Sequence, residues 1–246
     1  MAMKQRIEVA KRGSERLSGA MDWYREHWGN FEANLAFLEK TGLLDRPATI
    51  LDIGCHRGGL LRSIAARGHR AFGCDIEELH VRICAQHIAA CVADGQRLPF
   101  RNGSFDIVMT FDVFEHLPDS DAHLAEVKRV LRRGGCYVMQ TPNKWTNMIF
   151  HALIWGRTYG IRRALDFLKP PEHCSLHNFW RLRDRLERHG FAVQYYDVPV
   201  VNEHFRNKVR RYAGSLGVAA LNIYNPDRLP LWLRTNFYLV ARLGAL

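Results

Sequence analysis

The sequence has no long uncharged apolar segment. None of its apolar runs approaches the roughly 18 consecutive residues needed to cross a bilayer, and Met1 to Lys4 lead into charged residues rather than the apolar region of a signal peptide. These two absences argue against a membrane-spanning or secreted chain. We therefore expect a soluble protein located in the cytoplasm.

Paired cysteines are also missing. The 246 residues contain six cysteines but no Cys-x-x-Cys motif, and most of the six lie within apolar runs. We interpret them as buried thiols in a reducing compartment, and we expect no metal site. The hydrophobic fraction of 47% is sufficient for a sizeable core.

Acidic residues are scarce in the second part of the chain. Residues 1–143 contain 19 Lys and Arg against 18 Asp and Glu, whereas residues 144–246 contain 16 against 7, so +9 of the net charge of +10 lies after residue 143. A local excess of positive charge attracts anionic partners such as phosphate esters, acidic glycans or anionic lipid surfaces. The alternative is that these arginines are solvated on helix faces.

Strand-like and helix-like segments alternate at short intervals from residue 48 onward. Apolar, β-prone runs are expected to form strands at 48–53, 70–74, 91–93, 105–110, 136–140, 191–198 and 236–242. Helical patterns lie between them, including one whose apolar face carries Leu124, Val127 and Leu131 and which is expected to end at Gly134 and Gly135. A basic helix is expected over 203–212. The alternation predicts an α/β fold with a Rossmann-like, seven-stranded, mostly parallel sheet covered by helices on both faces.

Three sections of the chain are expected. Residues 1–46 form an N-terminal helical cap, with an amphipathic helix over 22–40. Residues 47–143 form a ligand-binding core. Residues 144–246 add a helical insertion after the fifth strand, complete the sheet and supply part of the pocket.

The Gly-rich turn after the first strand is the sharpest local signal. An apolar run, Ile50 to Ile53, ends at Gly54 and gives way to helix-like sequence after Gly58 and Gly59. Such a turn lets the backbone approach a nucleotide-like ligand, although many Gly-rich turns bind nothing. The dinucleotide motif Gly-x-Gly-x-x-Gly is absent, which argues against NAD and FAD and leaves a dehydrogenase as the alternative within this fold.

Acidic residues recur where the predicted strands end. Asp52, Asp75 and Asp94 end or follow the first three strands, and Asp112 to His116 follow the fourth. Ligands in parallel sheets bind at the carboxyl ends of the strands. Asp75 lies 21 positions after Gly54, where a carboxylate can bind both hydroxyls of a ribose.

Taken together, these segments resemble the class I S-adenosylmethionine-dependent methyltransferases, in particular the group that includes the ubiquinone-biosynthesis and other small-molecule enzymes. The resemblance is strong over about residues 48–143. The segments are Leu51 to Cys55, Asp75, Ala93 to Phe100, Ser104 to Val108, Phe114 to Leu117 and Leu131 to Gly135.

The resemblance implies a set of cofactor-binding residues. The glycine turn would pass under the methionine part of S-adenosylmethionine, Asp75 would bind the ribose hydroxyls, and Asp94 with its neighbours would recognise the adenine. S-adenosylhomocysteine would be the product. The set comprises Asp52, Gly54, Cys55, Gly58, Asp75, Ile76, Asp94, Gly95, Gln96 and Phe111. One departure is His56, which stands where the family usually has a second glycine.

Two histidines are candidate catalytic residues. A general base is needed only where the acceptor must lose a proton, and His116, beyond the fourth strand, has a suitable intrinsic pKa. His173, in a segment that also contains His177, is the second candidate. A structural role for His116 is an equal alternative.

The sequence therefore predicts a methyltransferase that acts on a hydroxyl of a small molecule or of a lipid- or sugar-linked acceptor. An anionic acceptor and contact with a membrane surface are expected from the basic C-terminal part and from the mixed apolar and basic residues of 144–171. The alternatives are an RNA methyltransferase, disfavoured because no RNA-binding module or Asn-Pro-Pro-Tyr sequence is evident, and a non-catalytic binding protein.

Overall fold

A computed structural model describes residues 30–146, 174–223 and 225–244. Seven strands form one sheet in the order β3-β2-β1-β4-β5-β7-β6. Their bounds are β1 (Thr49–Ile53), β2 (Arg70–Asp75), β3 (Ala89–Val92), β4 (Phe105–Phe111), β5 (Leu131–Pro142), β6 (Phe191–Tyr196) and β7 (Asn236–Leu243). Each of the first five strands pairs in parallel with its neighbours among those five, and β7 lies antiparallel to both β5 and β6. The predicted seven-stranded, mostly parallel sheet is confirmed.

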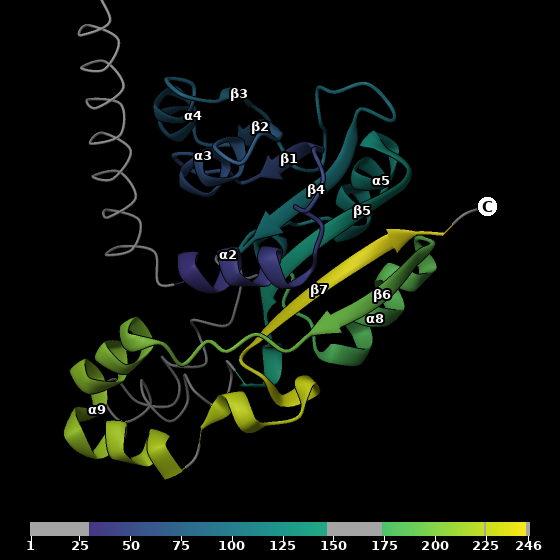
Figure 1. Cartoon of the computed structure of the whole chain (residues 1–246). Helices are drawn as coiled ribbons and strands as arrows, with labels where there is room; N and C mark the ends of the chain where they lie inside the picture. The colour runs from purple at the N-terminus through teal and green to yellow at the C-terminus, as the bar shows by residue number, and fades with distance from the viewer. Residues whose placement is uncertain (1–29, 147–173, 224, 245–246) are drawn as a thin grey trace, which may run out of the picture.

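Helices cover both faces of the sheet, as Figure 1 shows. On one face lie α2 (Phe31–Lys40), α3 (Gly59–Ala65) and α4 (Glu78–Cys84), and on the other lie α5 (Ser120–Val130) and α8 (Phe179–Arg188). A longer helix, α9 (Glu203–Ile223), lies at the lower end of the view. The short helical turns are η1 (Phe114–His116), η2 (Pro226–Arg228) and η3 (Leu231–Leu233).

Two hydrophobic cores follow from the alternation of side chains along the strands. Ile50 of β1 and Ile107 of β4 face α2 and α3, whereas Leu51 and Val108, one residue further along each strand, face α5. All five residues of β1 are buried, as expected for a central strand with both faces covered. This arrangement fixes the carboxyl ends of β1, β2 and β4 side by side.

The helix starts are explained by local capping. Asp119 accepts hydrogen bonds from the N–H groups of Asp121 and Ala122 at the start of α5, and Asn178 accepts one from the N–H of Arg181 at the start of α8. These caps set where each helix leaves the loop before it. The loop before α5 contains η1, which lies at the carboxyl end of β4.

Two expected boundaries are wrong. The helix expected to reach Gly134 ends at Val130, because Leu131 pairs with Phe105 as the first residue of β5 and the glycines form an irregularity within that strand. The basic helix expected over 203–212 continues to Ile223, with non-helical backbone at Gly214.

Parts of the expected cap and insertion lie outside the described residues, so the three-section division stays a prediction. Within the part of the expected cap that is described, α2 confirms the C-terminal half of the helix predicted over 22–40. No helix in the described part of the chain is long and apolar enough to cross a membrane.

Candidate functional site

A cavity of about 710 Å³ opens at the carboxyl ends of β1, β2 and β4. Its walls come from the turn after β1, the ends of β2 and β4, the loop after β3 and η1. The lining residues are Ile53, Gly54, His56, Asp75, Ile76, Glu77, His80, Ala93, Asp94, Gly95, Gln96, Phe111, Asp112, Val113, His116, Leu117 and Pro118.

The glycine turn forms one wall. Gly54 has φ +77°, and a Cβ placed there would lie 2.3 Å from Cγ2 of Val113 on the facing wall. Its N–H and that of Cys55 both donate to the carbonyl oxygen of Cys74 on β2. The turn is therefore anchored to β2 and packed so closely that glycine is required.

Asp75 joins the turn to the cavity. Its Oδ2 accepts a 2.8 Å hydrogen bond from the N–H of His56, and its Oδ1 accepts one of 2.9 Å from the N–H of Glu77. Each carboxylate oxygen has a second lone-pair direction, which suits the hydroxyls of a ribose. The carboxylate thus holds the turn in place and still faces the cavity.

His56 has an unusual conformation for a residue with a side chain. Its φ is +49°, and its ring lies 3.8 Å, centre to centre, from that of His80 on α4. Burial lowers the pKa of His56, and the neighbouring His80 and Arg57 lower it further, while Asp75 acts in the opposite direction. Histidine is therefore accommodated in the left-handed region that glycine normally occupies, and its ring lines the cavity.

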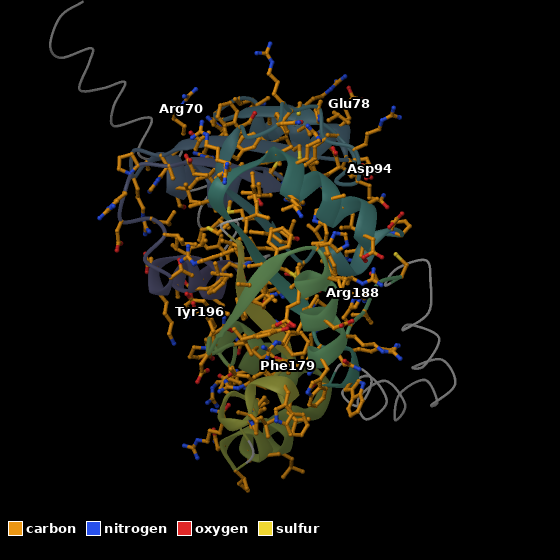
Figure 2. All side chains as sticks on the ribbon, turned by 90° about the vertical axis from the view of Figure 1, so that its right-hand side faces the viewer. Arg70, Glu78, Asp94, Phe179, Arg188 and Tyr196 are labelled. Atoms are coloured by element: carbon orange, nitrogen blue, oxygen red, sulfur yellow. The ribbon has the colours of Figure 1, made fainter. Side chains whose placement is uncertain are left out.

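The loop after β3 brings three predicted residues to the cavity wall, namely Asp94, Gly95 and Gln96. The Asp94 carboxylate accepts a 2.8 Å hydrogen bond from the N–H of Gln96. Behind the loop, Nδ1 of His123 lies 2.7 Å from the carbonyl oxygen of Gly95. Figure 2 shows Asp94 toward the upper end of the molecule.

His123 belongs to a buried chain of hydrogen bonds that sequence reasoning missed. Its Nε2 lies 3.0 Å from the hydroxyl of Tyr137, which lies 2.6 Å from Oγ1 of Thr110. Since Nδ1 must donate to the carbonyl of Gly95, Nε2 accepts from Tyr137. Burial lowers the pKa of His123 to about 4, so the ring is neutral and fixes the loop. The one available signal was that its position in the helical pattern is on the buried face of α5.

Three predicted cofactor-binding residues lie behind the cavity wall rather than in it. Asp52 and Cys55 are 4% and 3% exposed, and neither they nor Gly58 is among the lining residues. Burial, Cys84 and Asp75 raise the pKa of Asp52. Gly58 packs on Cys84, since a Cβ there would lie 2.5 Å from its Sγ. The structure thus places these residues beneath the turn, and their contact with a ligand stays a prediction.

The segment after β4 carries a second set of ionisable groups. His116 lines the cavity with its side chain 49% exposed, and its Nε2 lies 3.9 Å from Oε1 of Glu115. Glu115 is 2% exposed and accepts a 2.9 Å hydrogen bond from Oγ1 of Thr141. Burial and the nearby Asp112 raise the pKa of Glu115 to about 8. Glu115 was not predicted as a site residue, and its position beside His116 was the available signal.

The second predicted catalytic residue, His173, lies outside the described residues. The chain resumes at Cys174, and the N–H of Ser175 donates a 2.9 Å hydrogen bond to the carbonyl oxygen of Glu115. The segment that follows residue 173 therefore passes beside η1. His177 is 9% exposed and is not among the lining residues.

The fold and the site together define a class of protein. A sheet with this strand order, a glycine turn after β1, an acidic residue at the end of β2 and a further acidic loop after β3 are the features of a class I methyltransferase fold. Residues 51–139 also match the family model described as a methyltransferase domain. This segment of the chain is therefore a methyltransferase domain of the S-adenosylmethionine-dependent class.

Named relatives agree with this assignment. The chain is 35% identical over 148 residues to a protein of Mycolicibacterium smegmatis named as a probable S-adenosylmethionine-dependent methyltransferase, a match that covers 59% of this chain and 52% of the relative. It is 30% identical over 159 residues to a ubiquinone biosynthesis O-methyltransferase of Caulobacter vibrioides, covering 57% and 63% of the two chains. The matched region thus spans only about half to two thirds of these relatives.

Solved structures share the fold. An S-adenosylmethionine-dependent methyltransferase from Mesorhizobium loti superimposes with a TM-score of 0.62 at 20% identity, covering 88% of this chain and 99% of that one. Phosphoethanolamine N-methyltransferase 2 of Haemonchus contortus, solved with S-adenosyl-L-methionine, gives a TM-score of 0.59 at 17% identity and covers 87% and 52%.

Proposed function

We propose that this chain transfers a methyl group from S-adenosylmethionine to a hydroxyl oxygen of a small-molecule, lipid-linked or sugar-linked acceptor in the cytoplasm. The observation that carries the proposal is the position of His116. It lines the same cavity as Asp75 and Asp94 and has the Glu115 carboxyl group as a neighbour. The ubiquinone biosynthesis O-methyltransferases among the relatives support transfer to oxygen.

The lining residues fit the cofactor. Asp75 suits the ribose hydroxyls, and the missing Cβ of Gly54 lets Val113 pack directly against the turn without moving into the cavity that both residues line. Apolar contact is available from Ile76, Phe111 and Leu117. When bound, S-adenosylmethionine supplies a methyl group on a positively charged sulfur and becomes S-adenosylhomocysteine.

The chain's own residues would align the acceptor and handle its proton. A hydroxyl oxygen gains a bond to the methyl carbon and must lose its proton, which His116 accepts in this proposal. Burial and Asp112 raise the pKa of the neighbouring Glu115 to about 8, so its carboxyl group holds a proton near neutral pH, with Oε1 3.9 Å from Nε2 of His116. Val113, Leu117 and Pro118 line the same region and would limit the access of water.

The test is to incubate the protein with methyl-labelled S-adenosylmethionine and fractionated lipid, glycan, metabolite and RNA extracts. We expect the label in a lipid, glycan or metabolite fraction, attached to oxygen. Label in RNA would establish the RNA methyltransferase alternative instead. Calorimetric binding of the cofactor with no label in any fraction would indicate a binding protein, and binding of a nicotinamide cofactor without S-adenosylmethionine would indicate a dehydrogenase.

His116→Gln tests the proposed base. Loss of a general base lowers kcat by about 10²- to 10⁴-fold, while the affinity for S-adenosylmethionine stays unchanged because Asp75 and Asp94 remain. The matched control is His189→Gln, since His189 pairs with Asp121 and is not among the lining residues. If His116→Gln retains the kcat of the control, the acceptor needs no base at this position and the assignment of His116 is wrong.

A further inference from the structure

Three exposed tryptophans from separate parts of the chain meet on the surface. Trp145 follows β5, Trp180 is on α8 and Trp232 is in η3, and their exposed fractions are 49%, 53% and 39%. The ring centres of Trp145 and Trp180 lie 6.5 Å apart, and those of Trp180 and Trp232 lie 5.6 Å apart. We call these three residues the tryptophan patch. A cluster of large exposed side chains of this kind marks an interaction surface.

Positive charge borders the tryptophan patch. Lys144 comes directly before Trp145 in the sequence and Arg181 directly after Trp180, and both are exposed. Burial lowers the pKa of His177, the hydrogen bond with Ser175 acts in the opposite direction, and Arg185, Lys144 and Arg181 lower it further, so these three cations lie near one ring. Arg185 pairs with Asp121, whereas Lys144 and Arg181 have no acidic partner among the described residues.

The tryptophan patch is connected to the cavity by a short segment. Ser175 donates a backbone hydrogen bond to Glu115, next to the cavity residue His116. Two residues further on, the carbonyl oxygen of His177 accepts a 3.0 Å hydrogen bond from the N–H of Lys144. Residues 175–177 therefore join the tryptophan patch to the part of the cavity where the acceptor is expected to bind.

We propose that the tryptophan patch binds the surface of a membrane that contains anionic phospholipid. Indole rings partition into the region between headgroups and acyl chains, and neighbouring Lys and Arg bind anionic headgroups. The balance of +9 over residues 144–246 adds attraction over a longer range. Lys144 and Arg181, which have no acidic partner among the described residues, are the charge complement of an anionic lipid headgroup and favour a membrane surface over an uncharged apolar partner. This inference rests on the proposed function in one respect, since a membrane surface is where a lipid-linked acceptor would be located.

Vesicle binding tests the surface directly. The full chain is mixed with vesicles of phosphatidylcholine alone or of phosphatidylcholine with phosphatidylglycerol, and binding is measured by sedimentation and by the tryptophan emission spectrum. We expect binding to the anionic vesicles only, weakened by salt. Bromine-labelled phosphatidylcholine, mixed with phosphatidylglycerol, should quench tryptophan emission in the wild-type chain, a result that requires no variant.

Matched variants then locate the contact. Trp180→Ser with Trp232→Ser should lower vesicle affinity about tenfold or more, and Lys144→Gln with Arg181→Gln about tenfold. Leu79→Ser is the apolar control: Leu79 is 63% exposed and follows Glu78, which Figure 2 shows near the upper end of the molecule, whereas Phe179 of α8 lies in the lower half. Arg183→Gln with Arg188→Gln is the charge control, because these residues pair with Glu187 and Asp184 on the same helix. Both controls should bind vesicles as wild type does.

Three outcomes would overturn the proposal. They are no binding of the wild-type chain to anionic vesicles, equal losses in the patch variants and their controls, and self-association in solution that the tryptophan variants abolish. Thermal unfolding and calorimetry with S-adenosylmethionine confirm that each variant is folded. Since vesicle binding is measured without cofactor or acceptor, its failure is distinguishable from failure of the proposed methyl transfer.

Discussion

Single residues of the turn after β1 explain why it can face a ligand. Gly54 has a positive φ, and the side chain of Val113 packs directly against it, so both its backbone conformation and its missing Cβ matter. Gly68 also has a positive φ, of +89°, but a Cβ there would meet nothing within 4 Å, and Gly68 is not among the residues that line the cavity. Substitutions at these two glycines therefore distinguish the stability lost through the backbone conformation from the effect of an added Cβ on ligand binding.

Gly54→Ala should weaken the binding of S-adenosylmethionine by at least about tenfold, because the added Cβ displaces Val113 into the cavity. It should also lower the free energy of unfolding by roughly 1–2 kcal/mol for the left-handed conformation, and by more for the contact with Val113. Gly68→Ala should lower the free energy of unfolding only by the part that belongs to the left-handed conformation, and should leave the affinity for S-adenosylmethionine unchanged. Calorimetry and urea unfolding measure the two quantities. Equal affinities in the two variants would contradict this account of the turn.

His56 predicts a pH dependence that differs between the cofactor and its product. Its pKa is lowered from 6.5 by burial and then by His80 and Arg57, against the opposing effect of Asp75, so its ring gains a proton only below pH 6.5. S-adenosylmethionine carries a sulfonium charge that S-adenosylhomocysteine lacks. A protonated His56 in the cavity wall therefore repels the cofactor more than the product.

We expect the affinity for S-adenosylmethionine to fall as the pH is lowered below 6.5, and the affinity for S-adenosylhomocysteine to fall less. His56→Gly should remove this difference. It should also leave stability within about 1 kcal/mol of wild type, because glycine tolerates φ +49° but gains freedom in the unfolded chain. Calorimetry across this pH range is the measurement, with His189→Gln as control. A His56→Gly variant that keeps the difference would show that His56 is not the group responsible for it.

At the scale of elements, α5 supports the loop after β3 through a hydrogen bond from a neutral histidine. The folded pKa of His123 is about 4 against 6.5 for the unfolded chain, so between these values the unfolded state binds more protons. The contribution of His123 to stability is complete above pH 6.5 and is lost as the pH falls toward 4. The whole change is about 3 kcal/mol.

Urea unfolding between pH 4 and 6.5 measures this contribution. His123→Gln should reduce the slope of the free energy of unfolding against pH over that interval. The reduction corresponds to a difference of up to about one bound proton between the folded and unfolded states. Tyr137→Phe should keep the wild-type slope while lowering stability at all these pH values by about 1–2 kcal/mol, since it removes the hydroxyl but leaves His123 in place. An unchanged slope in His123→Gln would show that other groups, such as His177, account for the dependence.

The strands were predictable from sequence to different degrees. β1, β2 and β4 are apolar runs that end at or just before Gly or Asp, so it could be predicted that Gly54 and Asp75 lie at one edge of the sheet, where the cavity opens. The irregularity in β5 could not, because glycines end helices and interrupt strands alike.

The less predictable site residues are those whose role depends on a distant partner. His123 acquires its role from the carbonyl of Gly95, and His80 from the ring of His56. Asp52 shows the reverse case: its position at the strand end is as predicted, but its side chain lies behind the cavity wall. Position along the chain predicts which strand end a residue occupies, whereas packing decides whether its side chain reaches the cavity.

For the whole molecule, the sheet unites parts of the chain that are far apart in sequence. β7, near the end of the described chain, pairs with β5, and β6 completes the edge. The cavity walls come from residues 53 to 118, held by strands with both faces covered. The cavity therefore exists only when the sheet has formed, which links ligand binding to folding.

This linkage gives a prediction for the intact chain. S-adenosylmethionine at about one hundred times its Kd should raise the free energy of unfolding by about 2.7 kcal/mol, because it binds the folded state alone. For a chain of this size that corresponds to a rise in Tm of roughly 5–10 °C. At the same ligand concentration Gly54→Ala should gain less and Gly68→Ala the full amount, since only the first substitution narrows the cavity. Thermal unfolding with and without ligand measures the gain. A wild-type chain that gains nothing from S-adenosylmethionine but is stabilised by a nicotinamide cofactor would reassign the cavity to the alternative ligand.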